Sequence, residues 1–478
     1  MIDLLIKNGI IVTMDPQRRV LDNGAIAIDG DRIIAVGASD DLEAQYEARQ
    51  VIDAHHKLAM PGIIDAHAHA GHGLIKTMGS DDADLWYQAC QLIYTQGSDA
   101  PFWHAEARLS ALERLKTGTT FGVNYLGGGE SFMATDETRF GDAYCRAVAD
   151  VGIRAMLAVG PGGPPFPQTY RRWPDGAPVE QQISHEQMMA SSEALIQQWH
   201  GGANGKIQLC VCFPTPKPGQ YTPGTEAFAD LQRRAADARA LSRQYSVLFT
   251  MDGHQRSTIE FCHDHLHLLG SDAFFSHCIN LTEREIALCA ETGTRVAHNP
   301  SAVFSIMGRC PVPELLDAGV IVMICSDGTA PDRSYDMFRH MWQAMHYHRR
   351  HFEDPMVLPP GKALEMITID AAHGLGVADD LGSLEAGKKA DVVLIDLDKP
   401  HFYPLAMPVH RLIYFAKGSD VDTVVVDGEI LMAGRQVNTV NEADILAAAQ
   451  AEMALALDRT DLWSYLETRD GFWGRSRY

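Results

Sequence analysis

The 478-residue sequence lacks any apolar run approaching the roughly 20 residues needed to cross a bilayer, and it is poor in positive charge. It holds 40 lysines and arginines against 62 aspartates and glutamates, a formal net charge of −22. Nucleic-acid phosphates and anionic lipid surfaces repel such a chain. We therefore expect a small-molecule substrate, and neither nucleic acid nor a membrane as partner.

Closely spaced cysteine pairs are also scarce. The nine cysteines are scattered, and only Cys210 and Cys212 lie near each other in the sequence. An odd, dispersed set is typical of reduced thiols rather than of a disulfide framework. The stretch from Met1 to Lys7 is too short and too acidic for a signal peptide. These features predict a cytoplasmic protein.

Both ends of the sequence have the pattern of β-strands. Short β-branched segments separated by turn dipeptides such as Asn23-Gly24 fill the first sixty residues, and the same pattern returns after about residue 380. We expect residues 1–60 and 380–440 to form one composite β-sandwich domain. Residues 441–478 then form a C-terminal helix and tail.

The middle of the chain, residues 61–379, alternates short apolar strands with segments of helical length, which is typical of βα units around a parallel sheet. Eight such strands predict an α/β fold of the (β/α)8 TIM-barrel type. The loop 160–178, rich in glycine and proline, is expected to shape the pocket. The eight expected strands are 62–65, 119–124, 154–159, 206–213, 246–251, 273–277, 295–298 and 320–325.

Two histidines follow the first barrel strand, in the segment Pro61-Gly62-Ile63-Ile64-Asp65-Ala66-His67-Ala68-His69. In an extended chain, residues two apart face the same side, so both imidazoles can reach one ion. Taken alone, a His-x-His pair is better explained as two histidines on a solvated strand face. The pair therefore predicts a metal site only if partners occur elsewhere.

Such partners occur at four other strand ends. Barrel enzymes carry their chemistry at the carboxyl ends of the strands, so these residues are expected to meet. Metal ions in proteins are commonly bound by histidine and carboxylate. The strand-end residues are Asp252, His254, His277, His298 and Asp327.

The order of these motifs resembles the amidohydrolase superfamily. Besides the His-x-His segment, the resemblance rests on Ser276-His277-Cys278, His298-Asn299-Pro300-Ser301, Ser326-Asp327-Gly328 and the closing segment from Gly382 to Asp391. The chain is most similar to the branch that contains the atrazine chlorohydrolase-type triazine hydrolases and the guanine, cytosine and S-adenosylhomocysteine deaminases.

The resemblance implies that His67, His69 and Asp327 bind the metal, and that His277 polarises the substrate or orients the attacking water. Asp327 would also accept a proton from that water. Binuclear relatives use a lysine at the end of the fourth strand, and this strand ends without one. We therefore expect one divalent ion, zinc, with iron, manganese or cobalt as alternatives.

The fifth strand departs from the pattern, which expects His-x-x-Glu. An ungapped alignment puts Asp252 in the histidine place and Gln255 in the glutamate place, whereas a shift of two puts His254 and Ser257 there. Neither alignment restores the glutamate. We expect His254 to complete the metal ligands and Asp252 to act in catalysis, with the reverse assignment left open.

Three further residues are expected to bind substrate: His298, Tyr125 and Phe304. For His298 a structural role is an equal alternative, because apolar residues follow it. Flat apolar walls suit a planar ligand, although core packing explains each aromatic taken singly. The aromatic candidates for such walls are Phe102, Trp103, Tyr170, Trp173, Phe249 and Phe304.

The sequence thus predicts a metal-dependent hydrolase that uses an activated water to cleave a C–N bond of a small nitrogenous, heterocyclic compound, as deaminases do. A first alternative is another leaving group on the same fold: chloride, alkylamine, amide, urea or carbamate. A second is a relative that binds a ligand with little turnover, since the glutamate is lost. The resemblance also implies a homo-oligomer, a dimer or larger.

Overall fold

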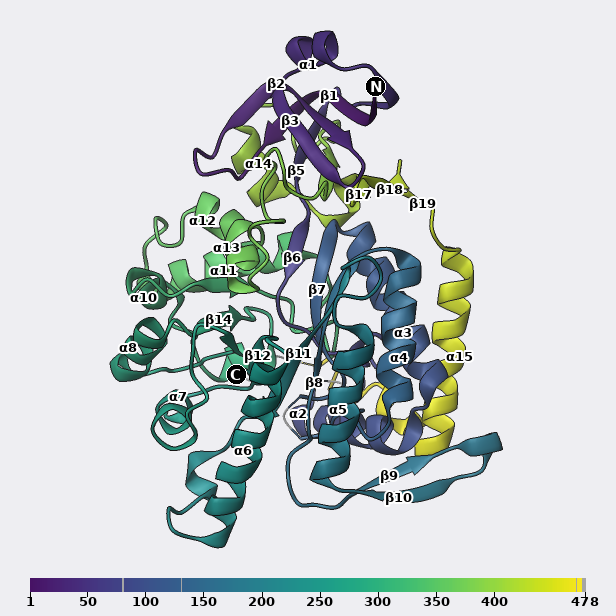
Figure 1. The fold of residues 1–478 in the computed structure, drawn as a ribbon, viewed down its shortest axis with the longest axis vertical. Helices are drawn as coiled ribbons and strands as arrows, with labels where there is room; N and C mark the ends of the chain where they lie inside the picture. The colour runs from purple at the N-terminus through teal and green to yellow at the C-terminus, as the bar shows by residue number, and fades with distance from the viewer. Residues whose placement is uncertain (80, 130, 470, 475–478) are drawn as a thin grey trace.

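A computed structural model describes residues 1–79, 81–129, 131–469 and 471–474 of the chain. A β-rich part carries the N-terminus at the top of Figure 1, and a barrel surrounded by helices lies below it. The nine cysteines are free thiols and all are buried. None of the helices in these ranges has both the length and the hydropathy that a bilayer crossing needs.

The barrel strands confirm the predicted (β/α)8 fold. Eight parallel strands pair in the order β15-β14-β13-β12-β11-β8-β7-β6. Their bounds are β6 (Ile63–Asp65), β7 (Thr119–Tyr125), β8 (Arg154–Val159), β11 (Ile207–Pro214), β12 (Phe249–Asp252), β13 (Ala273–Ser276), β14 (Arg295–His298) and β15 (Val322–Ile324).

The barrel is nearly closed, because a short segment bridges its first and last strands. The Ile324 amide donates to the Met366 carbonyl at 3.1 Å, and the Ile64 amide donates to the Ile367 carbonyl at 2.9 Å. Backbone groups that would otherwise form two free edges are thereby paired. The strand ends that carry the site residues consequently form one continuous rim.

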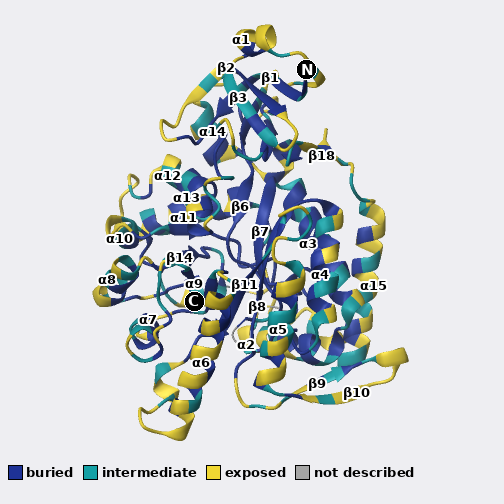
Figure 2. Ribbon diagram, in the orientation of Figure 1, coloured by how far each residue is buried: buried dark blue, intermediate teal, exposed yellow. Residues whose placement is uncertain are grey.

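Helices cover the outside of the barrel. Strands β7 and β8 are buried along their whole length, as expected of parallel strands covered on both faces, whereas the helices expose one side to solvent (Figure 2). The barrel-associated helices are α2 (Ala83–Leu92), α3 (Ala100–Lys116), α4 (Thr138–Val151), α5 (His185–Trp199), α6 (Glu226–Gln244), α7 (Thr258–Phe261), α8 (Glu283–Thr292), α9 (Val303–Met307), α10 (Val312–Asp317), α11 (Met337–Phe352), α12 (Pro360–Glu365) and α13 (Ile369–Gly374).

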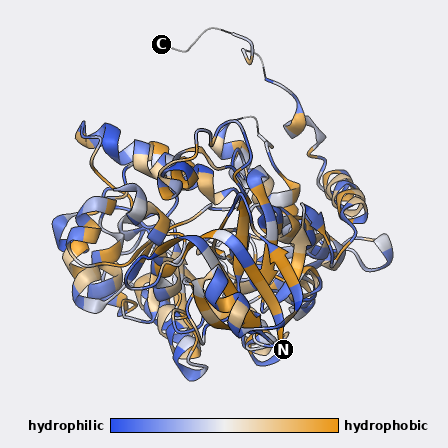
Figure 3. Ribbon diagram, turned by 90° about the horizontal axis from the view of Figure 1, so that it is seen from above, coloured by the Kyte–Doolittle hydropathy of each residue, from blue (hydrophilic) through white to orange (hydrophobic). Residues whose placement is uncertain are grey.

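The two ends of the chain meet in one nine-stranded sheet, which joins the predicted β-segments. Strand β5 from the N-terminal end pairs antiparallel with β16 from the C-terminal end, with Met60 opposite Val393. Seen from above, the strands are mainly hydrophobic (Figure 3). The strands are β1 (Ile2–Val12), β2 (Val20–Asp29), β3 (Arg32–Ala38), β4 (Ala48–Asp53), β5 (Lys57–Pro61), β16 (Val392–Asp396), β17 (Val421–Val426), β18 (Glu429–Ala433) and β19 (Gln436–Val437).

Among the described residues, three α-helices lie outside the barrel units. They are α1 (Ser39–Gln45), α14 (Pro408–Phe415) and α15 (Glu442–Thr460), the last of which packs along α3 (Figure 1). The predicted loop 160–178 contains part of a hairpin, β9 (Gln168–Arg172) with β10 (Val179–Ile183). Arg172 is buried there against Asp136, which explains why this polar segment folds as a hairpin rather than as a loose loop.

Candidate metal centre

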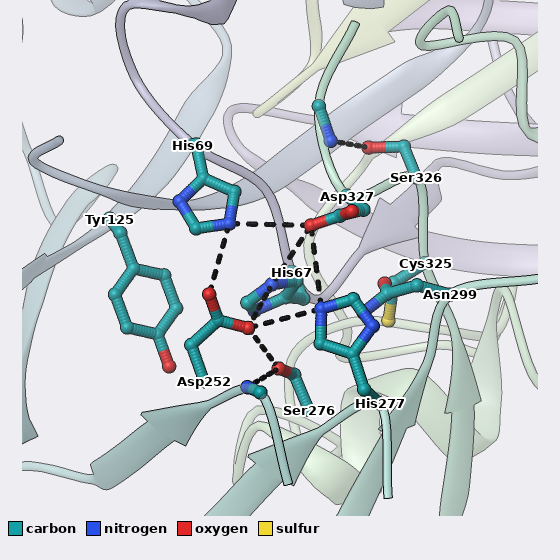
Figure 4. Close-up of polar contacts among 12 residues, drawn as sticks. His67, His69, Tyr125, Asp252, Ser276, His277, Asn299, Cys325, Ser326 and Asp327 are labelled. Carbon is teal, nitrogen blue, oxygen red and sulfur yellow. Dashed lines mark hydrogen bonds and ion pairs between the residues drawn. The ribbon is translucent and has the colours of Figure 1, made fainter. Parts of the chain in front are cut away.

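Four elements deliver five buried polar side chains to one point at the barrel rim. His67 and His69 follow β6, Asp252 ends β12, His277 follows β13, and Asp327 lies three residues after β15. Parallel strands place their carboxyl ends on the same face, which explains why residues so distant in sequence meet. Figure 4 shows the three imidazoles turned toward the two carboxylates.

The distances within this cluster are short and similar. His67 Nε2 lies 3.2 Å from Asp252 Oδ1 and 3.3 Å from Asp327 Oδ1. His69 Nε2 lies 3.3 Å from both carboxylates. His277 Nε2 lies 3.2 Å from Asp252 Oδ1 and 3.7 Å from Asp327 Oδ1. Three Nε2 atoms and two carboxylates therefore surround one small volume.

This arrangement fits a divalent metal ion. Donor atoms that each lie about 2.0–2.2 Å from one ion are about 3.0–3.6 Å apart, close to the spacing found here. His67 Nε2 is fully buried and forms no hydrogen bond, although two carboxylate oxygens lie within 3.3 Å of it. Buried polar atoms rarely remain without a partner. Two overlapping ligand sets are possible, His67 with His69 and Asp327, and His67 with Asp252 and His277.

The electrostatics of the cluster favour ionised carboxylates. Burial alone would raise the pKa of Asp252, but the adjacent imidazoles of His67 and His69 outweigh it and hold that pKa well below its usual range. Burial likewise opposes ionisation of Asp327, and the Arg333 guanidinium and His277 overcome it, so its pKa is also well below its usual range. Both carboxylates thus carry the charge that a cation requires.

Neighbouring groups orient the cluster. His69 Nδ1 lies 3.0 Å from the Gly127 carbonyl, and a proton on Nδ1 would direct the Nε2 lone pair toward the carboxylates. The Ser276 hydroxyl donates to Asp252 Oδ1. Asp65 accepts the Ser326 amide at 2.9 Å and the Ser326 hydroxyl at 2.6 Å, which fixes the loop that carries Asp327.

Two residues of the cluster have strained backbones. His277 has φ 64° and Asp327 has φ 61°, in the left-handed region that non-glycine residues rarely adopt. Hydrogen bonds hold both: the His277 amide donates to the Ala297 carbonyl at 3.0 Å, and the Asp327 amide to the His67 carbonyl at 3.0 Å. Strain of this kind is often found at functional sites, where the surrounding structure enforces it.

The structure does not bring His254 into the cluster. Strand β12 ends at Asp252, and Gly253 follows with φ 82°, so Asp252 and His254 do not face the same side as they would in a continuing strand. His254 Nδ1 instead lies 2.9 Å from the Thr258 hydroxyl, and its ring stacks on Phe275. Burial lowers the pKa of His254 to about 3 and keeps the ring neutral.

A cavity of about 430 Å³ opens beside the cluster and is lined by its residues His69, Asp252, His277 and Asp327. Phe304 lines it too, with its ring 4.7 Å from the His277 ring. The other aromatic residues that line the cavity, among those the structure describes, are Trp86, Tyr87 and Phe132.

The other two residues expected to bind substrate are buried and are absent from the described cavity lining. Tyr125 is buried, and its hydroxyl contacts the Thr250 hydroxyl at 2.7 Å. His298 is buried beside His348, with ring centroids 5.2 Å apart. Five aromatics expected to line the pocket are absent from the described cavity lining: Phe102, Trp103, Tyr170, Trp173 and Phe249.

Sequence reasoning missed Arg333 and most of the aromatic lining. Arg333 lies in the loop between β15 and α11, six residues beyond Asp327, and lines the cavity from there. Its position is too far from a strand end for the barrel pattern to indicate it. Trp86 comes from α2, and Phe132 from the loop after β7. Only the amphipathic pattern of α2 near the first strand could have indicated Trp86.

Solved structures of similar fold include two zinc-bound enzymes. An adenosine deaminase from Xanthomonas campestris with bound zinc is 25% identical, with a TM-score of 0.80 over 96% of this chain and 99% of that one. An atrazine chlorohydrolase from Arthrobacter aurescens complexed with zinc shares the fold at 22% identity, with a TM-score of 0.76 over 94% of this chain and 100% of that one.

Curated relatives extend over nearly the whole chain. A 5-methylthioadenosine/S-adenosylhomocysteine deaminase of Moorella thermoacetica is 31% identical over 94% of this chain and 99% of its own length. A 5′-deoxyadenosine deaminase of Methanosarcina mazei is 28% identical over 94% of this chain and 97% of its own.

Family models agree with these similarities. Residues 24–46 match an imidazolonepropionase-like composite domain of bacteria, and residues 58–431 match the amidohydrolase family. These matches confirm the resemblance found in the sequence. The chain belongs to the amidohydrolase family, together with its deaminase relatives, and is a metal-dependent hydrolase of carbon–nitrogen bonds.

Proposed function

We propose that the chain is a mononuclear zinc hydrolase that removes an amino group from an sp² carbon of a small planar heterocycle. The observation that carries this proposal is the buried convergence of three Nε2 atoms and two carboxylates, at 3.2 to 3.7 Å, on the wall of a cavity. Zinc is supported by the two zinc-bound structural neighbours, while histidine and carboxylate ligands also suit iron, manganese or cobalt.

In this proposal His67, His69 and Asp327 hold the ion, and Asp252 takes the fifth-strand position in place of His254. The wholly buried strand end and the short contacts of Asp252 to three imidazoles support that exchange. A single ion is supported by β11, which contains no lysine along its length to serve as a bridging ligand.

When bound, a divalent ion lowers the pKa of a coordinated water and supplies a nucleophile near neutral pH. The side chains of the chain then have separate tasks. Asp327 and Asp252 present carboxylate oxygens that accept a proton from the attacking water. His277 reaches the same point through Nε2, where an N–H stabilises negative charge that develops on the substrate.

A second candidate reaction expels a different leaving group: it cleaves the C–N bond of an amide, urea or carbamate, or displaces alkylamine or chloride from a carbon atom. One observation favours it: Gln255 and Ser257, the two residues that could replace the glutamate, are both exposed and absent from the described cavity lining. Ring deamination requires a proton at the heterocycle as well as at the leaving nitrogen, and in the leading proposal one of the two carboxylates would have to deliver it instead of Gln255 or Ser257.

The purified chain tests these reactions directly. Metal content is measured first, and release of ammonia, amine or chloride is then followed with 5′-deoxyadenosine, 5-methylthioadenosine, aryl amides, ureas, carbamates and chlorotriazines. Ammonia from an aminoheterocycle supports the proposal, and amine from an amide, urea or carbamate supports the second candidate. Bound metal without any product would overturn both and indicate a ligand-binding relative. Asp327→Asn should abolish whichever activity is found.

The cytoplasmic location and the homo-oligomer that the sequence implies remain predictions. Sedimentation velocity of the purified chain would test the second of these. A single species at the 52.5 kDa of one chain would contradict it.

A further inference from the structure

The guanidinium of Arg333 is buried against one carboxylate of the metal centre. Its side chain is 3% exposed, whereas that of the adjacent Asp332 is 55% exposed. Arg333 Nη2 lies 3.0 Å from Asp327 Oδ2 and donates to the Asp327 carbonyl at 3.1 Å, and it also donates to the Ala330 carbonyl. One nitrogen thus contacts both the side chain and the backbone of Asp327.

The two oxygens of Asp327 consequently have different surroundings. Oδ1 lies within 3.7 Å of the Nε2 atoms of His67, His69 and His277, while Oδ2 faces Arg333. An unrestrained carboxylate can turn about its last torsion and present either oxygen, or both, to an ion. The contact with Arg333 removes that freedom.

We propose that Arg333 is a positioning residue that holds Asp327 with Oδ1 alone directed at the metal, an inference that rests on the proposed metal site. Arg333 acts through Asp327 and does not bind substrate. The planar guanidinium suits this task because its donors have fixed directions, whereas a lysine ammonium is a compact charge on a flexible stem. Charge-assisted hydrogen bonds of this type are also stronger than neutral ones.

The proposal predicts a change in metal binding that a merely structural arginine would not cause. In Arg333→Met, Asp327 is free to present both oxygens. We expect the affinity for Zn²⁺, measured by chelator competition, to fall about 10- to 100-fold, the usual effect of losing a group that orients a ligand. The visible spectrum of the Co²⁺-substituted protein should lose intensity, because coordination rises. Arg333→Lys should retain the charge and show an intermediate spectrum.

A matched control exists at the opposite end of the barrel. The Arg239 side chain is as buried as that of Arg333, and its Nη1 lies 2.9 Å from Oδ2 of Asp272, a 44% exposed carboxylate just before β13. Arg239→Met removes a buried guanidinium from a carboxylate without approaching the cluster. We expect it to lower thermal stability as Arg333→Met does, while leaving the Co²⁺ spectrum and the Zn²⁺ affinity unchanged.

The outcomes separate this inference from the proposed function. If Arg333→Met and Arg333→Lys keep the wild-type affinity and Co²⁺ spectrum but raise KM with kcat unchanged, Arg333 binds substrate and the inference is wrong. If Arg333→Met does not fold, the same comparison with Arg333→Lys decides. If the wild-type chain binds neither Zn²⁺ nor Co²⁺, the proposed metal site itself fails. Altered affinity and spectrum in the Arg333 variants alone support the inference.

Discussion

At the scale of single residues, the metal centre depends on which side chain β12 presents to the histidines. Asp252 contributes a carboxylate where a third neutral imidazole would otherwise stand, so with Asp327 the cluster holds two negative charges. The buried Arg333 offsets one of them. Compared with a centre that has one carboxylate beside the same arginine, the second carboxylate strengthens the attraction for a divalent cation in this low-dielectric surrounding.

Replacing Asp252 and His254 singly tests this assignment. Asp252→Ala removes contacts of 3.2 to 3.3 Å to three imidazoles, and we expect the zinc content of the purified protein to fall at least about tenfold. His254 is hydrogen-bonded to Thr258 and lies outside the cluster, so the zinc content of His254→Gln should match that of the wild type. Elemental analysis per folded protein is the measurement. The reverse result would assign the ligand position to His254.

Buried neutral histidines make the fold sensitive to acid. Burial lowers the pKa of His348 to about 3, well below its ordinary value of 6.5, so the ring stays neutral when folded and gains a proton on unfolding. The contribution of His348 to the free energy of unfolding is therefore fully present above about pH 6.5. It is lost as the pH falls toward 3, because the unfolded state then binds more protons than the folded state.

The pH effect is measurable with one substitution on α11. Between pH 7.5 and 5.5, His348→Leu should lose about 1 kcal/mol less unfolding free energy than the wild type, as followed by urea denaturation. Trp342→Leu changes an exposed residue without a titratable group on the same helix and should keep the wild-type slope. Equal slopes for all three proteins would contradict the prediction.

At the scale of elements, the end of β12 decides the orientation of Asp252. Gly253 has φ 82°, and a Cβ added there would meet only Phe304 Cζ, at an ordinary 3.7 Å. The glycine is therefore required by the backbone conformation and not by lack of space. This turn ends the alternation of the strand and separates Asp252 from His254.

Gly253→Ala should thus destabilise the fold by about 1–2 kcal/mol, the cost of a left-handed backbone for an L-residue. Because relief of that strain would rotate Asp252, zinc affinity should fall as well. Gly361→Ala offers a control, since it lies in α12 with nothing within 4 Å and no left-handed φ, and it should be neutral or slightly stabilising. Thermal unfolding and chelator competition measure both effects. A neutral Gly253→Ala would show that the turn does not set the site.

The same turn explains what the sequence could and could not predict. The eight strands, and the meeting of His67, His69, His277 and Asp327, follow from strand periodicity and from the common rim of parallel strands. Whether Asp252 or His254 faces that rim depends on one glycine torsion, which periodicity does not contain.

The cavity walls were less predictable. Trp86 and Phe132 come from a helix and a loop whose placement depends on tertiary packing, and the buried pairing of Arg333 with Asp327 involves loop geometry after β15. Apolar residues such as Phe102 and Trp103 carry the same sequence pattern whether they pack in the core or line a pocket.

At the scale of the whole molecule, an ion-pair network fastens the β-rich part to the barrel. Arg154, at the start of β8, donates to both oxygens of Asp391, at 2.9 and 3.0 Å, and also contacts Asp427. Asp391 immediately precedes β16 and closes the Gly382–Asp391 motif. The motif therefore has a structural role, because its last residue forms an ion pair with the barrel strand β8. We propose on this basis the division at about residues 60 and 380.

Arg154→Met should weaken the attachment of the β-rich part to the barrel and lower the free energy of unfolding. The substitution leaves the buried Asp391 carboxylate without its bidentate partner, and breaking one side of a buried pair costs about 3–5 kcal/mol. Arg49→Met, which removes an exposed pair with Asp3, should leave the free energy of unfolding nearly unchanged. Adding Asp391→Asn to Arg154→Met should recover part of the loss, since the uncompensated charge is then gone. Urea unfolding of the four proteins measures these differences. If Arg154→Met costs no more than the surface control, the network does not fasten the β-rich part to the barrel.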